Sequence, residues 1–195
     1  MRRNVAYVVI ALAVALLVGG LRIHFLPERL MAERTDIYVK QAGGHNRFVH
    51  QKLPDASWRE FVSPSPDLLY SYLVFDTTQA PIAVEIPGHD DYWINQMVDD
   101  RTDTFGYVGH DTARGGVSKF VVYSDVTPAF DVPEGFSTFK SPSPTGLFLL
   151  RYLVRTPDSI DRIDEARQRI RVNGVRSCNN IFYLIGYFYG ETFTN

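Results

Sequence analysis

The sequence predicts a mainly β protein: an antiparallel β-sandwich or jelly-roll-like domain with one packed helix, preceded by an N-terminal transmembrane helix. Three observations lead to this fold class. Residues 5–21 form an apolar run that contains no charged residue, which suits a membrane-spanning helix. From residue 69 onward, β-like runs recur at spacings of about 10–15 residues with Pro, Gly and Asp between them. One later stretch has the periodicity of an amphipathic helix.

The apolar run predicts a signal anchor. At 1.5 Å per residue its helix would be roughly 26 Å long, close to the ~30 Å hydrocarbon core of a bilayer. Arg2 and Arg3 precede the run, so the positive-inside rule places the N-terminus in the cytoplasm and the rest outside it. The alternative is a cleaved signal peptide, but residues 18–20 do not form an A-x-A cleavage pattern. The lipid bilayer, contacted through residues 5–21, is the first predicted partner.

The composition divides the rest of the chain into three parts. Residues 26–62 read as a linker that carries a short amphipathic helix from about Leu26 to Arg34, and residues 63–175 as the β-sandwich domain. Residues 176–195 form an aromatic C-terminal tail, interpreted either as a buried terminal element or as a surface for the bilayer or a partner.

Within the sandwich domain the predicted strands are short and end at turn residues. They cover residues 69–75, 82–86, 92–98, 105–108, 119–123, 136–140 and 147–154. The one helix is expected over residues 157–172, with Pro157 at its first position and Asn173-Gly174 ending it. Because its apolar stripe has helical spacing and its other face is charged, this helix should pack on the sheet.

Charge and cysteine content exclude two classes of protein. The net charge is −2 with mixed signs, so no nucleic-acid surface is expected. Cys178 is the only cysteine, and an exported domain with one thiol cannot form an internal disulfide.

Motifs for known chemistry are incomplete. Ser137 and Lys140 match S-x-x-K by letter, but a strand would place them on opposite faces. His45 and His50 lie five apart without a third ligand nearby, and the aspartates that flank residues 92–98 read as turn and strand-end residues. The sequence therefore predicts neither a metal nor a cofactor.

Two functions remain open from the residues alone. The first is an envelope module that binds a small-molecule ligand or another envelope protein. The second is an enzyme with an acid–base site on one sheet face, built from polar or tyrosine residues at strand ends. Its candidate residues are Asp67, Tyr70, Asp76, Tyr92, Asp99 and Arg151. The enzyme interpretation requires that at least three of these side chains converge in an apolar pocket.

The order of several short motifs resembles a bacterial family, the domain of unknown function 1254. The motifs are Pro66-Asp67-Leu68-Leu69-Tyr70-Ser71-Tyr72, Pro81-Ile82-Ala83-Val84-Glu85-Ile86-Pro87, Tyr92-Trp93-Ile94-Asn95-Gln96-Met97-Val98-Asp99, Tyr107-Val108-Gly109 and Leu149-Leu150-Arg151-Tyr152. The resemblance covers about residues 63–172 and implies an antiparallel β-sandwich or jelly-roll-like domain in an envelope protein, a short, single-domain, membrane-anchored member of the family. The predicted anchor would then lie in the bacterial cytoplasmic (inner) membrane, with the domain facing the periplasm. It supplies no catalytic residues. The chain departs from the family pattern at Pro66, where an Asn is usual, and at Ser124-Asp125, which replaces a Gly-Pro.

Overall fold

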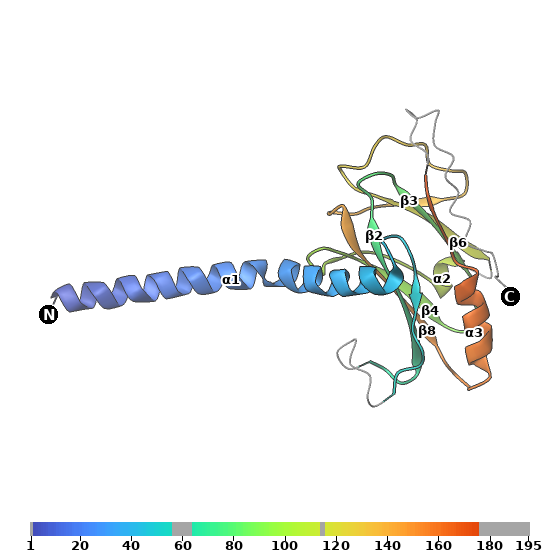
Figure 1. Cartoon of the computed structure of the whole chain (residues 1–195), viewed down its shortest axis with the longest axis horizontal. Coiled ribbons are helices and arrows are strands. Elements are labelled where there is room, and N and C mark those ends of the chain that lie inside the picture. The colour runs from blue at the N-terminus through green and yellow to red at the C-terminus, as the bar shows by residue number, and fades with distance from the viewer. Residues whose placement is uncertain (1, 56–63, 114–115, 176–195) are drawn as a thin grey trace, which may run out of the picture.

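Two β-sheets stacked face to face form the body of the protein, and a long helix projects from it (Figure 1). This computed structural model describes residues 2–55, 64–113 and 116–175. The aromatic tail predicted at 176–195, including Cys178, lies outside the described residues. The mainly β fold class with a packed helix is confirmed.

The first sheet, sheet A, has five antiparallel strands in the order β1-β2-β8-β4-β5. Their bounds are Val49–His50 (β1), Leu68–Asp76 (β2), Thr145–Leu153 (β8), Trp93–Asp99 (β4) and Thr104–Gly109 (β5).

Sheet B has four strands in the order β7-β6-β3-β9. They are Ser137–Lys140 (β7), Val117–Tyr123 (β6), Ile82–Pro87 (β3) and Arg171–Gly174 (β9). β7 pairs with β6 in parallel, so sheet B is mixed at this edge, whereas the sequence predicts antiparallel strands. The long connection through residues 124–136 returns the chain to the end of sheet B at which β6 begins. β7 can therefore run parallel to β6.

Two helices close the open sides of the sandwich. α2, His110–Ala113, connects β5 of sheet A to β6 of sheet B. α3, Ser159–Gln168, covers the opposite side: Ile163 enters the core between the sheets, and Arg167 reaches the backbone of β2.

α3 is shorter than the sequence predicts. Asp158 is its N-cap, so Pro157 lies before the helix. The helix ends at Gln168, with Arg169 as its C-cap, instead of continuing to residue 172. The residues that follow pair with β3, where Val172 lies opposite Val84. β-strand pairing with an available edge has outweighed the continuation of the amphipathic pattern.

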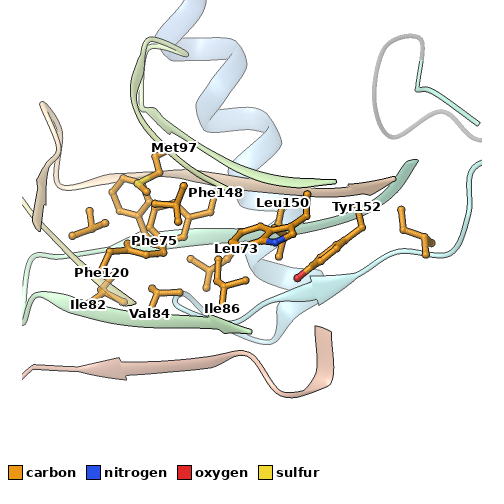
Figure 2. Packing of buried hydrophobic residues seen from close by; sticks show 14 of the residues in the cluster. Leu73, Phe75, Ile82, Val84, Ile86, Met97, Phe120, Phe148, Leu150 and Tyr152 are labelled. Carbon is orange, nitrogen blue, oxygen red and sulfur yellow. The ribbon is translucent and has the colours of Figure 1, made fainter. Parts of the chain in front are cut away.

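The core lies between the sheets and is built from alternate residues of each strand. Figure 2 shows Phe148, Leu150 and Tyr152 of β8 on one side, facing Ile82, Val84 and Ile86 of β3 on the other. At one end the core is purely apolar, and the ring centroids of Phe120 and Phe148 lie 6.0 Å apart there.

The N-terminal helix α1 runs without a break from Arg2 to Ala42. The sequence predicts a short helix that ends near Arg34, but the observed helix passes through Pro27 and continues to the Gly43-Gly44 turn, where both glycines have positive φ. An i,i+4 ion pair between Arg29 and Glu33 stabilises the second half of the helix.

Tertiary packing also extends α1. Met31 and Tyr38 lie buried on the outer face of sheet A against Tyr72, Val74 and Leu147. The rings of Tyr38 and Tyr72 have centroids 4.2 Å apart. The segment Leu26–Ala42 is therefore a stem that is docked on the domain, and β1 adds a further ordered element to the region expected as linker.

The first half of α1 is not packed in this way against any described residue. Its apolar side chains are open on all sides, with Val8 67% and Leu16 69% exposed. By length and composition, α1 is a helix that could cross a membrane.

Candidate functional site

The six residues that the sequence proposes for an acid–base site do not form one cluster. Tyr70 and Arg151 are direct cross-strand partners on sheet A, while Asp67 and Tyr92 accept backbone hydrogen bonds at the nearby end of β8. Asp76 and Asp99 lie at the far end of the same sheet, opposite Thr145 and Gly146. Tyr70 and Asp76 are six positions apart along β2, a distance of about 20 Å between their backbones.

The local contacts of these residues are structural. The Tyr70 hydroxyl accepts a hydrogen bond from the Ser65 backbone at 3.0 Å, and Arg151 donates to Gln96 Oε1 at 2.9 Å. Asp99 Oδ1 accepts the backbone N–H groups of Arg101 and Asp103 and so holds the β4–β5 turn. The six residues therefore lie at two ends of sheet A, and none of them lines the grooves described below.

Among the described residues, no group of three or more His, Cys, Asp or Glu side chains is placed to hold a metal ion. His50 instead lies beside Ser71, with Nδ1 2.9 Å from the hydroxyl oxygen.

A different set of polar residues gathers inside the sandwich. At one end of the core, the inward positions of β4 and β8 hold the apolar residues Met97 and Phe148. Toward the other end they hold Asn95, Trp93 and Tyr152. Ser118 takes the corresponding inward position of β6, directly across from Ile86 of β3. We call Trp93, Asn95, Ser118 and Tyr152 the polar end of the core.

These four side chains are buried and have polar atoms that no described residue contacts through a hydrogen bond. Trp93, Asn95 and Tyr152 have no exposed surface, and Ser118 is 7% exposed. Within the described part of the chain, no partner is found for Trp93 Nε1, both amide atoms of Asn95, Ser118 Oγ or the Tyr152 hydroxyl. Buried polar groups in proteins are almost always satisfied, so this cluster calls for an explanation.

One rim of the polar end is closed by an ion-paired turn after β3. The ring of His89 stands edge-on to the ring of Tyr152 at 5.9 Å, and His89 Nδ1 accepts the backbone N–H of Asp91 at 3.1 Å. Arg155 donates to Asp91 at 2.9 Å. Burial raises the pKa of Tyr152 well above its usual range, so its hydroxyl remains protonated at neutral pH.

The other rim opens at an edge groove between the sheets, with a volume of about 440 Å³. Val108 of β5 and Ser118 of β6 form its inner part, and α2 and β7 form its sides. Val108 is the cross-strand neighbour of Asn95 on the inward face. The edge groove therefore meets the polar end of the core at Ser118 and beside Asn95. The lining residues are Tyr107, Val108, Thr112, Val117, Ser118, Lys119, Gly135, Ser137 and Phe139.

A second groove of about 490 Å³ lies where α3 meets β1, and a buried arginine forms its floor. Arg167, 4% exposed, donates to the carbonyl oxygens of Gln51 at 2.9 Å and Tyr70 at 3.2 Å, and forms an ion pair with Asp164. The guanidinium is used to fasten α3 to the edge of sheet A. Burial and the Arg167 charge lower the pKa of His50 to about 4, so its imidazole is neutral at pH 7.

Ser71, His50 and Asp164 resemble a nucleophilic triad by residue type alone. Ser71 has no exposed surface, so a substrate in this groove cannot reach its hydroxyl, and Asp164 is paired with Arg167. This groove does not have the geometry of a nucleophilic active site.

Sequence reasoning missed the polar end of the core. Its signal was present, because Asn95 and Ser118 occupy inward positions in otherwise apolar alternation. Only the sheet pairing shows which positions of β4 and β6 face inward. It also shows that these two strands belong to opposite sheets across the core.

Fold and site together define a β-sandwich domain on a long N-terminal apolar helix, with an internal polar cluster next to a groove. The chain belongs to the family described as protein of unknown function (DUF1254), whose model matches residues 45–174. This match confirms the resemblance and begins earlier than residue 63, so it includes β1.

Two solved structures match part of this chain, and the first is similar to it in fold. One is the VPA0106 protein from Vibrio parahaemolyticus, with 16% identity, a TM-score of 0.55, and coverage of 78% of this chain and 39% of that one. The other is an uncharacterized protein from Burkholderia cenocepacia, with 15% identity, a TM-score of 0.47, and coverage of 86% and 44%. The chain thus spans about two fifths of each of these proteins. A search of curated proteins found no match.

Proposed function

We propose that this protein is a membrane-anchored binding module of the bacterial cell envelope, with its β-sandwich on the periplasmic side. The observation that carries the proposal is the edge groove, which reaches from the surface to Ser118, a buried hydroxyl without a partner among the described residues. A groove that combines apolar side chains with a few polar groups suits a small-molecule site. The six scattered acid–base candidates do not favour an enzyme.

The continuity of α1 supports the anchor. Its exposed apolar half suits a lipid environment, and its second half is docked on sheet A through Met31 and Tyr38. The Arg2-Arg3 pair before the apolar run supports a cytoplasmic N-terminus. The bilayer, contacted through residues 5–21, is then the first partner, and a small-molecule ligand is the second.

The location is tested by fusing alkaline phosphatase after Asn195. Alkaline phosphatase is active only when it folds outside the cytoplasm, so we expect an active, membrane-bound fusion. An expressed but inactive fusion would place the domain in the cytoplasm. Activity released into the soluble periplasmic fraction would show that the segment is cleaved.

The binding role is tested by thermal shift of the full chain in detergent with fractions of a periplasmic small-molecule extract. A ligand stabilises the folded state by RT ln(1 + [L]/Kd), so a binding fraction should raise Tm by several degrees. Ser137→Trp, at the mouth of the edge groove, should abolish that shift, whereas Val126→Trp, an exposed position away from the groove, should preserve it. Equal shifts in both variants would rule out this groove, and no shift with any fraction would favour a protein partner.

A further inference from the structure

We propose, building on the binding function above, that the ligand is a small neutral molecule with an apolar body and an amide or hydroxyl group. It enters through the edge groove and places that group at the polar end of the core, among Trp93, Asn95, Ser118 and Tyr152. The argument rests on the unpartnered atoms, their placement, the route to them and the charges around them.

The polar end differs from the other buried hydroxyl groups of the protein. Thr77 Oγ1 donates to Ser124 Oγ at 2.9 Å, Ser143 donates to a carbonyl at 2.6 Å, and Ser159 does so at 2.7 Å. Leaving a buried polar group unsatisfied costs about 1–3 kcal/mol. The described residues thus satisfy these hydroxyls and leave four unpartnered side chains at one end of the core, which indicates that something else supplies the missing partners. The other unpartnered atoms are the Nε atoms of Arg151 and Arg167, whose guanidinium groups donate through other nitrogens.

The strand register brings these groups to the same end of the interior. Trp93 lies directly opposite Tyr152 on the neighbouring strand, and their ring centroids are 6.1 Å apart. Asn95 follows Trp93 on the same face. Because Phe120 contacts Phe148, the next inward residue of β6, Ser118, lies toward Leu150 and Tyr152. Figure 2 shows the Tyr152 hydroxyl pointing from its own sheet toward the strand of Ile86.

The groups offer both kinds of hydrogen bond. The indole N–H and the amide nitrogen can only donate, the Asn95 carbonyl oxygen can only accept, and the two hydroxyls can do either. An amide or alcohol group matches this set, since it also donates and accepts. The flanking rings of Trp93 and Tyr152 and the side chain of Leu150 provide an apolar wall for the rest of the molecule.

Three charged side chains around this region are already paired, which argues for a neutral ligand. Lys119, on the rim of the groove, lies 3.8 Å from Glu85 and stands over the ring of Phe136 at 5.7 Å. Arg155 is paired with Asp91, and Arg167 with Asp164. A charged ligand at the polar end would lose its hydration without gaining a counter-charge.

The test uses the full chain in detergent with the Trp58→Phe substitution, which leaves Trp93 as the only tryptophan. Benzamide and benzyl alcohol serve as neutral probes, and benzoate and benzylamine as charged counterparts of the same size. We expect the neutral probes to change Trp93 fluorescence saturably and to raise Tm. The charged probes should bind at least tenfold more weakly.

A variant pair locates the site. Asn95→Leu replaces an unpartnered buried amide with an apolar side chain of similar size, so it should fold and retain or gain stability. It should weaken benzamide binding at least tenfold. Asn173→Leu makes the same change on the exposed strand β9 and should leave binding unchanged.

Three results would overturn the inference. If benzoate binds as tightly as benzamide, the neutral class is wrong, and if Asn95→Leu binds benzamide normally, the site is wrong. If no neutral probe binds, the polar end holds ordered water only. The proposed binding function is judged separately. In each of these cases, the extract can still raise Tm, and Ser137→Trp can still abolish that rise.

Discussion

At the scale of single residues, Arg167 shows how a charged side chain can hold two elements together. Its side chain extends from α3, and its guanidinium donates to two carbonyl oxygens. One belongs to Gln51, directly after β1, and the other to Tyr70 in β2. An exposed arginine on an amphipathic helix is the ordinary expectation. Here the open edge of sheet A supplies acceptors, so the charge is buried on the inner side of the helix.

Replacing Arg167 with alanine should lower the free energy of unfolding by about 3 kcal/mol, because buried carbonyl groups lose their donor and Asp164 loses its partner. Arg162→Ala, on the exposed side of the same helix, should change it by less than about 0.5 kcal/mol. Chemical denaturation followed by circular dichroism measures both values. Similar losses in the two variants would contradict the fastening role of Arg167.

His50 should make stability depend on pH. Its pKa is about 4 in the folded protein and 6.5 in the unfolded chain. The contribution to stability is complete above pH 6.5, and it is lost as pH falls from 6.5 toward 4, because only the unfolded state gains the proton. Allowing for solvent around the ring, we expect a loss of about 1 kcal/mol over this range. His50→Gln should flatten the change in Tm between pH 7 and pH 4.5, and an unchanged slope would contradict this assignment.

At the scale of elements, the second half of α1 behaves as part of the domain. Tyr38 is 4% exposed against sheet A, while its neighbour Ile37 is 47% exposed. Tyr38→Ala should cost about 3 kcal/mol of packing and free the stem, whereas Ile37→Ala should have little effect. Trypsin cleavage after Arg34 and Lys40 should accelerate only in Tyr38→Ala. Equal cleavage of both variants would show that the stem is not held by this contact.

The elements also show which boundaries depend on partners. The strand at 147–154 was predicted from its apolar run alone and appears as β8, the centre of sheet A. In contrast, β9 lies in a segment whose local pattern continues a helix, and it forms because the edge of β3 is available. β1 has two residues and no periodic signal, and it exists only as the partner of Tyr72 and Ser71.

At the scale of the whole molecule, the stem completes the outer face of sheet A. A chain of residues 29–195 keeps Met31 and Tyr38 on Tyr72, Val74 and Leu147, whereas a chain of residues 43–195 exposes these side chains. The shorter chain should be less stable by about 3 kcal/mol or more and prone to aggregation. Thermal unfolding and size-exclusion chromatography compare the two. Equal stability and solubility would show that α1 contributes nothing to the domain.

The sequence by itself determined the apolar helix, the mainly β class and the positions of most strands, because each depends on patterns within a few consecutive residues. The parallel pairing of β7, the extension of α1 to Ala42 and the burial of Arg167 were decided by tertiary structure. The same holds for the candidate site. Asn95 and Ser118 are ordinary polar residues in their own strands, and they become an internal cluster only when two sheets bring distant segments face to face. Local preference identifies an element, whereas the partner of each side chain depends on contacts between segments far apart in the chain.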